Sequence, residues 1–390
     1  METREVKLGD VATVKGGKRL PKGTNLITTP NNHPYIRVRD LNGRRTLELD
    51  NSFEFVDDET QKTISRYVVD NGDIVLSIVG TIGLVAIIGK SLDKANLTEN
   101  CVKLASLSGI DRDFLYYFLK SSFGQQEITR GTVGAVQAKL PIKNIQDITI
   151  PLPDEFTQRK IAAILSSLDE KIETNQKIND NLQKQAAALF ANFYDQAETE
   201  VGFTEMIQIL GGGTPKTGES SYWNGDIPFF TPKDVGFPYT LTTEKTITEE
   251  GLAHCNSRLY PINTVFVTAR GTVGKVGLPG VPMAMNQSCY ALVGKDTHQL
   301  LVYFYTLKAV DRLKHKASGA VFDAITTRDF EAENIMKLSD DDTKAFLDVA
   351  EPIYQAVLNN SIENLRLAEL RDSLLPKLMN GEIDVSGIQL

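Results

Sequence analysis

The sequence has little of the chemistry on which metal sites, disulfide frameworks and membrane spans depend. It holds 3 Cys, 4 His and 1 Trp, and the cysteines (Cys101, Cys255 and Cys289) lie far apart with no CxxC pair. No window approaches the roughly 18 uninterrupted apolar residues that a membrane span needs, and residues 1–10 alternate charged with apolar side chains, unlike a signal peptide. We therefore expect a cytoplasmic protein without a metal site or disulfide, whose cysteines are buried.

An excess of positive charge is also missing. Lys and Arg number 42 against 50 Asp and Glu, for a net charge of −8, which taken alone argues against a nucleic-acid binder. The charges are unevenly distributed, however. Between residues 15 and 45 the only acid is Asp40, whereas acids gather in segments 154–173 and 340–351. The basic segment keeps DNA binding open, and the length of 390 residues indicates more than one domain.

The most informative pattern is an internal duplication with a period of roughly 190 residues. The sequence Gly-Thr-Ile-Gly at 80–83 is repeated as Gly-Thr-Val-Gly at 271–274, in each case after an apolar run. Cys101 in the first half corresponds to Cys289 in the second. Gly-rich segments and aromatic runs recur in the same order. Because solenoid repeats span only about 20 to 50 residues, this period indicates two similar domains in tandem. Short β-branched runs and helical aromatic runs make each an α+β domain.

Each repeat ends in a long segment whose apolar and Asn positions alternate steps of three and four, as in a heptad seam. The first seam contains Leu165, Leu168, Ile172, Asn175, Asn179, Leu182 and Leu189, and the second contains Ile353, Val357, Asn360, Asn364, Leu367 and Leu374. We expect one helix over residues 154–195 and a second that Pro352 kinks or restarts and Gly381 ends. The two would pair as an antiparallel intramolecular coiled coil; the alternative is that each helix packs only on its own domain.

Several motifs occur in a defined order along the chain. They are Lys-Leu-Gly-Asp-Val-Ala at 7–12, the Gly-Thr-Ile/Val-Gly of both halves, Ile-Thr-Ile-Pro-Leu-Pro at 148–153 with Thr-Gln-Arg-Lys-Ile at 157–161, and the closing segment 370–383. In this order they resemble the specificity subunit of type I restriction-modification systems over essentially the whole chain. The second half departs from the pattern, with Met-Lys-Leu-Ser-Asp at 336–340 where the first has Pro-Leu-Pro-Asp.

The resemblance implies two target-recognition domains (residues 1–152 and 197–338) and two conserved spacer helices (153–196, and 339–390 with the tail), arranged with pseudo-twofold symmetry. It implies a non-catalytic subunit that reads an asymmetric bipartite site in double-stranded DNA. Two modification subunits that use S-adenosylmethionine to methylate adenine, and restriction subunits that use ATP and Mg²⁺, would bind it, so this chain needs no cofactor. The alternatives are a tandem structural or carbohydrate-binding scaffold and a DNA-modifying enzyme.

Candidate DNA-binding residues follow from charge and from the repeat. Arginines around a predicted strand could pair with guanine edges or clamp phosphates, or could form only a solvated charged face; these are Arg37, Arg39, Arg44 and Arg45. Further candidates in the first domain are Lys15, Lys18, Arg19, Lys22, Arg130, Gln137 and Lys139. Those in the second domain are Lys216, Lys233, Arg270, Lys275, Lys314, Lys316 and Phe322. Tyr222 and Trp223 could stack on a base or cap the core.

Two motifs come close to catalytic signatures and fail. Residues 213–220 fit a P-loop except that Glu219 replaces the lysine, and an acid there would repel the phosphate. Residues 32–35, Asn-His-Pro-Tyr, differ by one residue from the Asn-Pro-Pro-Tyr of adenine methyltransferases, but the repeat counterpart lacks the amide and no Gly-x-Gly loop precedes either. We therefore expect no catalytic residues in this chain.

Overall fold

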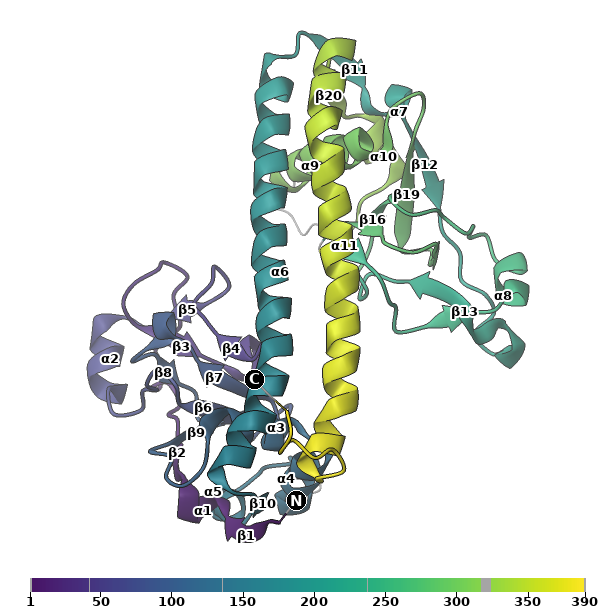
Figure 1. Ribbon diagram of the computed structural model, residues 1–390. Coiled ribbons are helices and arrows are strands. Elements are labelled where there is room, and N and C mark those ends of the chain that lie inside the picture. The colour runs from purple at the N-terminus through teal and green to yellow at the C-terminus, as the bar shows by residue number, and fades with distance from the viewer. Residues whose placement is uncertain (1, 42, 135, 237, 317–323, 389–390) are drawn as a thin grey trace. The chain divides into compact units, whose positions relative to one another are not determined.

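The computed structural model describes residues 2–41, 43–134, 136–236, 238–316 and 324–388 (Figure 1). The chain folds into two compact units: unit 1 comprises Met1–Ile172 and Arg366–Leu390, and unit 2 comprises Glu173–Leu365. Two long helices, α6 (Glu155–Gln196) and α11 (Asp340–Met379), each contribute one segment to each unit. Each long helix therefore packs as part of both units.

Unit 1 contains a five-stranded, a three-stranded and a two-stranded sheet. The five-stranded sheet has the order β2 (Thr13–Gly16), β9 (Cys101–Ala105), β6 (Ile74–Ser77), β7 (Val85–Ile88), β4 (Thr46–Leu47). The others are β5 (Glu54–Phe55), β3 (Pro34–Ile36), β8 (Asn96–Leu97), and β1 (Arg4–Lys7) with β10 (Thr149–Leu152). The helices are α1 (Leu8–Val11), α2 (Asp58–Ile64), α3 (Arg112–Lys120), α4 (Ser122–Gly131) and α5 (Ile142–Gln146).

Unit 2 repeats this topology strand for strand. Its five-stranded sheet has the order β12 (Ile207–Gly211), β19 (Cys289–Gly294), β16 (Val265–Thr268), β17 (Val276–Pro279), β14 (Tyr239–Thr240). The smaller sheets are β15 (Thr246–Ile247), β13 (Trp223–Phe230), β18 (Ala284–Met285), and β11 (Thr199–Gly202) with β20 (Asn334–Lys337). The helices are α7 (Phe203–Met206), α8 (Glu249–Ala253), α9 (Gln299–Lys316) and α10 (Thr327–Glu331). The predicted duplication of an α+β domain is confirmed.

The central strands β6 and β16 are apolar up to their last residues, Ser77 and Thr268, because both faces of each five-stranded sheet are covered. In β6, Ile74 and Leu76 join the core that includes α3, whereas Val75 joins a second core with the three-stranded sheet. In β16, Val265 and Phe266 divide between two cores in the same way. A strand buried on both faces loses the polar alternation of a half-exposed strand. The aromatic run that supplies each helical layer folds as α3 or α9, as its spacing predicts.

In unit 2, asparagines in the predicted seam connect α6 to α11 directly. The Asn175 amide donates to Asn364 Oδ1 (2.9 Å), and the Asn360 amide donates to Asn179 Oδ1 (2.8 Å). From the first pair to the second, the residue number rises from 175 to 179 on α6 and falls from 364 to 360 on α11, so the two segments run antiparallel. Leu182, Leu189 and Ile353 pack against the core that contains Val357. Because Asn175 and Asn179 are buried, a shift of register would leave their amides unpaired, which costs free energy.

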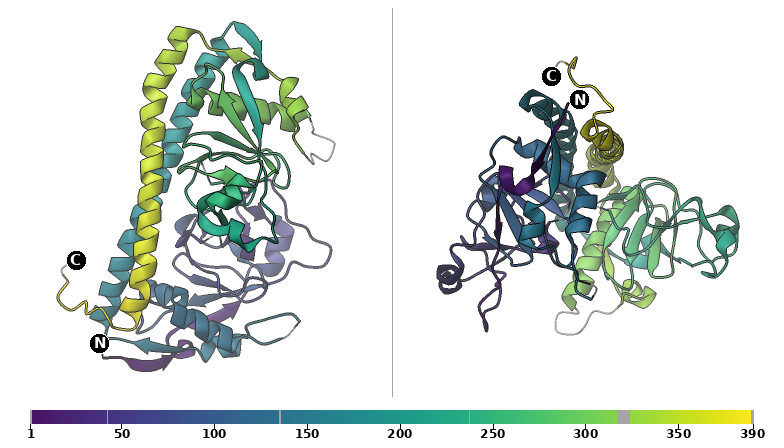
Figure 2. Two further views of the ribbon diagram at one scale, coloured as in Figure 1. Left: turned by 90° about the vertical axis from the view of Figure 1, so that its right-hand side faces the viewer. Right: turned by 90° about the horizontal axis from the view of Figure 1, so that it is seen from below.

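In unit 1, the segments of α6 and α11 share the core under α3 (Figures 1 and 2). Leu165 is fully buried there, and Leu374 packs against the same core. The remaining seam residues on this side, Leu168, Ile172 and Leu367, are partly buried. The alternative in which each long helix packs only on its own domain does not describe either unit.

Pro352 does not restart the second helix, which corrects that part of the expectation. Helix α11 continues from Asp340 to Met379 without interruption, and ends just before Gly381, which adopts φ +76°. A proline removes one N–H and so leaves one helical carbonyl without its usual donor. Because Pro352 is exposed, water can satisfy that carbonyl.

Candidate nucleic-acid interface

In both units the Gly-Thr-Ile/Val-Gly motif forms a tight loop at the end of a central strand. Ser77 Oγ donates to the Thr81 carbonyl (2.6 Å) and accepts from Leu84 N (2.8 Å). Thr268 forms the equivalent bonds with the Thr272 carbonyl and Lys275 N. The first and last glycine of each loop have φ between +74° and +91°, a region that side chains disfavour. The sequence motif is therefore a requirement of the backbone.

Further loops are tied to the same strand end. Ile78 N donates to the Asn100 carbonyl, and Leu140 N donates to the Ile78 carbonyl. The counterparts in unit 2 are Ala269 N to Ser288 and Ile325 N to Ala269. We call these loops the loop rim: residues 16–22, 37–41, 78–83, 98–100, 133–134 and 136–140 in unit 1, and 211–218, 231–235, 269–274, 286–288 and 324–325 in unit 2. Many of the charged candidates lie on it.

The Gly-rich loop of each rim approaches a neighbouring loop so closely that only glycine fits. A methyl group on Gly17 would lie 2.1 Å from the carbonyl oxygen of Thr98, and one on Gly212 would lie 2.1 Å from that of Asn286. The preceding residues, Gly16 and Gly211, have room for a methyl group. Both rims are thus fixed by the same close approach of two backbones.

This geometry predicts a sharp contrast between adjacent positions. Gly17→Ala should lower the free energy of unfolding by about 1–3 kcal/mol, because the methyl group must displace backbone rather than a mobile side chain. Gly16→Ala, the matched control, should change it by less than about 0.5 kcal/mol. Gly212→Ala and Gly211→Ala should repeat the contrast in unit 2. Denaturant unfolding of the four variants measures it, and equal effects within each pair would show that the close approach is wrong.

Most of the unit 1 candidates have exposed side chains on or beside the rim. Lys15, Lys18, Lys22, Arg44, Gln137 and Lys139 are exposed. The Lys139 backbone forms isolated bridges to Val79 and Val133, which holds the segment carrying Gln137 against the rim. Arg19 is 80% exposed and donates to Glu99 (2.7 Å), and Arg130 is 71% exposed and pairs with Glu127 (2.7 Å). Exposed cationic side chains are the groups that contact phosphates in protein–DNA complexes.

Arg37 and Arg39 are more constrained than the sequence suggested. Both guanidinium groups pair with Glu54, and the Arg37 side chain is 24% exposed against 56% for Arg39. The carboxylate of Asp40, 3% exposed, accepts a hydrogen bond from the Arg37 amide (2.7 Å) and so holds the turn on which both arginines stand. Arg39 is the better placed of the two to contact a nucleic acid, and Arg37 contributes mainly to the loop.

Burial of Asp40 predicts a pH dependence of stability. Desolvation, partly offset by Arg39, raises the pKa of Asp40 from 3.8 to about 6. The folded protein therefore binds a proton at Asp40 more readily than the unfolded chain does. The resulting contribution to the free energy of unfolding is complete below about pH 4 and is lost as pH rises through 6. A rise in the pKa from 3.8 to about 6 corresponds to about 2–3 kcal/mol of unfolding free energy.

Asp40→Asn removes this titration with little change of shape. The difference in unfolding free energy, wild type minus variant, should therefore fall by about 2–3 kcal/mol between pH 4 and pH 7. Using the difference cancels the other carboxylates that titrate in that range. Urea unfolding of both proteins across the range measures it, and a difference that stays constant with pH would contradict the raised pKa.

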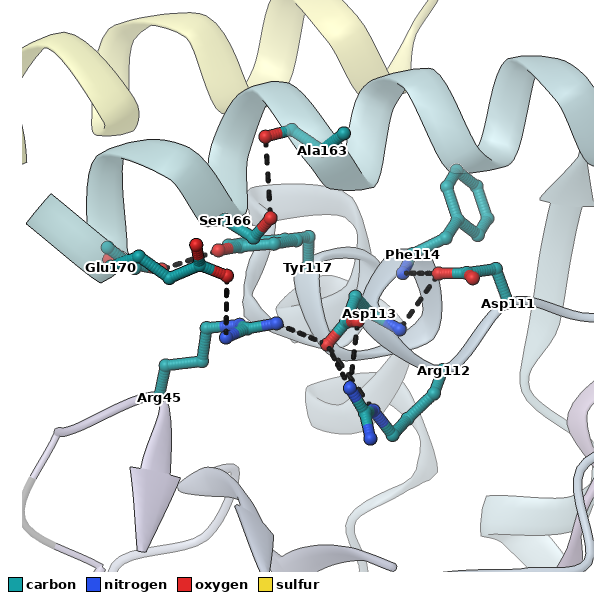
Figure 3. Close-up of polar contacts among 10 residues, drawn as sticks. Arg45, Asp111, Arg112, Asp113, Phe114, Tyr117, Ala163, Ser166 and Glu170 are labelled. Atoms are coloured by element: carbon teal, nitrogen blue, oxygen red, sulfur yellow. Dashed lines mark hydrogen bonds and ion pairs between the residues drawn. The ribbon is translucent and has the colours of Figure 1, made fainter. Parts of the chain in front are cut away.

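Arg45 requires a correction, because its side chain is part of the protein interior. It precedes β4 and is 10% exposed, with Nη2 2.5 Å from Asp113 and Nη1 3.9 Å from Glu170 (Figure 3). Asp113 lies in the first turn of α3 and Glu170 lies on α6, so Arg45 connects the sheet to both helices. Because the Arg45 guanidinium is only 10% exposed and already pairs with two carboxylates, it would have to break these pairs to reach DNA. We therefore assign Arg45 a structural role.

In unit 2, positive side chains surround a hollow of about 340 Å³ on the rim. It is lined by Lys233 and Arg270, both predicted, and by Lys245, which the sequence did not single out. Lys233 is 80% exposed, and the only acid among the lining residues, Glu244, lies 3.8 Å from it. Three cations against one carboxylate make this hollow suitable for an anionic group such as a phosphate.

The remaining unit 2 candidates lie in several places. Lys216, Lys275 and Lys314 are exposed. Lys316 pairs with Glu333, whose side chain is only 2% exposed. Phe322 lies outside the described residues. The rim itself therefore brings together only Lys216, Lys233 and Arg270, with Lys275 one residue beyond the Gly-Thr-Val-Gly loop.

The two aromatic candidates pack within unit 2. Tyr222 stacks on His254 at 5.0 Å, and Trp223 contacts Phe229 edge to face at 5.5 Å. The Trp223 indole donates to the Lys216 carbonyl (3.2 Å), and Lys245 lies over its ring. Of the two roles that the sequence left open, this geometry favours the cap on the core, because both rings already have protein partners.

Two of the three cysteines, Cys101 and Cys289, are buried, whereas Cys255 is partly exposed. No group of three or more His, Cys, Asp or Glu side chains among the described residues could hold a metal ion. Burial raises the pKa of Cys101 and of Cys289 to about 12, so both remain protonated and unreactive at neutral pH. Within the same part of the chain, no helix combines the length and apolar character needed to cross a bilayer.

Two copies of one α+β unit, each with its own loop rim, define a protein of two tandem domains, and sequence comparison gives its family. Residues 1–184 and 199–337 match the family described as type I restriction modification DNA specificity domain. The chain belongs to this family.

Similar proteins match between 63% and 97% of this chain. The MjaIX specificity subunit of Methanocaldococcus jannaschii is 22% identical over 97% of this chain and 93% of its own length. The HindI specificity subunit of Haemophilus influenzae is 24% identical over 63% and 71%. A crystal structure of the S subunit from M. genitalium covers 97% of this chain and 96% of its own, with 16% identity and a TM-score of 0.58. The last likeness shows that the fold is shared.

Proposed function

We propose that this chain reads an asymmetric bipartite site in double-stranded DNA and presents that DNA to partner subunits. The observation that carries the proposal is that one loop framework occurs twice with different side chains at equivalent positions. Arg39 corresponds to Lys233, Val79 to Arg270, and Glu99 to Gln287. Two rims that share a backbone but differ in hydrogen-bonding groups are suited to two different half-sites.

The partner assignments follow from family membership. We propose that two modification subunits, which would bind S-adenosylmethionine and methylate adenine, and restriction subunits that would use ATP and Mg²⁺ assemble on this chain. The chain itself would be non-catalytic and would bind no cofactor. We propose further that residues 1–152 and 197–338 act as the recognition modules, and 153–196 and 339–390 as the conserved spacer.

The salt dependence of duplex binding separates the three functions under consideration. If the exposed lysines and arginines of the rims contact phosphates, the logarithm of affinity should fall linearly with the logarithm of salt concentration, with a slope of about −4 or steeper. A titration of labelled duplex with the purified chain between about 0.05 and 0.2 M salt measures the slope. A slope near zero would favour a structural or carbohydrate-binding scaffold. Methyl transfer from S-adenosylmethionine by the isolated chain would favour the enzyme.

A further inference from the structure

One position of the rim carries a polar side chain in each unit: Glu99 in unit 1 and Gln287 in unit 2. The distribution of charge along the sequence did not single out either residue. Glu99 and Gln287 each stand two residues before a buried cysteine, Cys101 or Cys289. The residue before each of them is fixed to the three-stranded sheet: Thr98 N donates to the Ile36 carbonyl (3.0 Å), and Asn286 N donates to the Phe230 carbonyl (2.9 Å). Glu99 and Gln287 therefore occupy equivalent positions on the same rigid backbone.

Both side chains are held in place by the Gly-rich loop of their own unit. Arg19 Nε donates to Glu99 Oε1 (2.7 Å), and Thr214 Oγ1 donates to Gln287 Oε1. The same two loops meet at the close backbone approach of Gly17 and Gly212. Side chains that are fixed before binding lose less conformational entropy when they contact a ligand, which favours a role in recognition.

The surroundings make a carboxylate at position 99 unexpected. Glu99 pairs with Arg19, which follows the exposed Lys18 in the Gly-rich loop, and the Glu99 side chain is 30% exposed. Burial alone would raise the pKa of Glu99, but hydrogen bonds from Arg19, from its own amide and from Thr98 outweigh this effect, and the pKa lies below its ordinary value. An ionised acid on a phosphate-binding surface weakens binding unless it accepts a hydrogen bond from the nucleic acid.

In unit 2 the equivalent side chain adjoins the cationic hollow. Asn286 and Ser288, the chain neighbours of Gln287, both line the hollow that contains Lys233 and Arg270. Gln287 itself is exposed. A phosphate bound by these cations would therefore bring the edges of nearby bases within reach of an amide that both donates and accepts.

We infer that Glu99 and Gln287 are specificity-determining residues that read one base each, Glu99 accepting from the exocyclic amine of a cytosine and Gln287 pairing with the N6 and N7 edge of an adenine. A carboxylate can only accept, and cytosine offers a donor in the major groove, whereas adenine offers a donor and an acceptor side by side. This assignment rests on the proposed function, since it specifies which residues distinguish the two half-sites.

Glu99→Gln and Gln287→Glu test the inference, because each variant places the other unit's side chain on an equivalent backbone with almost no change of volume. The complex of the full chain with its modification subunits is used to select duplexes from a randomised library, and the selected DNA is sequenced. Glu99→Gln should reduce the preference for cytosine at one position of one half-site by about tenfold or more and leave the other half-site unchanged. Gln287→Glu should reduce a preference for adenine in the other half-site.

Glu59→Gln, an identical chemical change on the exposed face of α2, is the control and should select the wild-type sequence. The inference is overturned if either rim variant selects the wild-type sequence, or if its affinity falls equally for all sequences. A wild-type complex that enriches no sequence would overturn the proposed function as well. Enrichment by the wild type with unchanged rim variants would overturn this inference alone.

Discussion

Replacing Lys233, Lys245 and Arg270 together with glutamine is expected to produce the largest change in DNA binding. The three side chains line one hollow of unit 2, where a bound phosphate would release condensed counterions. Losing three such contacts should make the slope of log affinity against log salt less steep by about 3, and should weaken binding to all sequences alike. Titration of labelled duplex at several salt concentrations measures both effects.

The matched control changes net charge equally at exposed positions away from the rim. Lys184 lies on α6, Lys337 on β20 and Lys344 on α11, and all three are exposed in unit 2. Replacing them with glutamine should leave the salt slope within about 1 of the wild type. If both triple variants make the salt slope less steep by the same amount, the change reflects only the lower net charge of the protein. Our assignment of the unit 2 rim would then be wrong.

Asp169→Ala is expected to produce the largest loss of stability. Asp169, on α6, has a side chain that is 7% exposed, accepts from the Tyr117 hydroxyl (2.6 Å) and pairs with Arg371 on α11 (2.5 Å). Burial and the Asp169 carboxylate raise the pKa of Tyr117, so its hydroxyl stays protonated and donates. Removing the carboxylate leaves a largely buried guanidinium without this partner, which should cost about 3–5 kcal/mol of unfolding free energy.

Asp372→Ala controls for this effect because Asp372 pairs with the same arginine. Its side chain is 64% exposed, and Arg371 Nη2 lies 2.8 Å from it. A solvated pair of this kind should contribute less than about 1 kcal/mol. Denaturant unfolding of both variants gives the comparison. Equal losses would mean that the buried position of Asp169 is not what stabilises the helix pair in unit 1.

The sequence predicted the architecture well because the architecture depends on periodic and repeated features. The first long helix was expected over residues 154–195 and occupies Glu155–Gln196, and the strand expected at 265–268 is β16. Hydrophobic periodicity carries such elements because burial of one face requires it. The duplication added a second, independent copy of every local signal.

The roles of individual cations could not be predicted in the same way. Arg44 and Arg45 are neighbours in one basic run, yet the Arg45 side chain is only 10% exposed because it pairs with Asp113. This partner lies 68 residues away in the sequence, so the residues around Arg45 do not reveal it. Lys245 was missed because it follows a loop without a motif and joins Lys233 and Arg270 only through the fold of β13 and β15. The expected restart at Pro352 was wrong for a related reason. The free-energy cost of a proline within a helix depends on whether water can reach the unpaired carbonyl, and the spacing of apolar residues does not determine that exposure.

The central claim is that two differing rims in one chain read two separate stretches of DNA. Mapping methylated adenines in the DNA of cells that carry this chain with its modification subunits tests it most directly. We predict one recurring sequence made of two defined blocks that differ from each other and are separated by a spacer of constant length and undefined sequence. Methylation at a single uninterrupted motif, or at adenines without shared flanking sequence, would contradict the account.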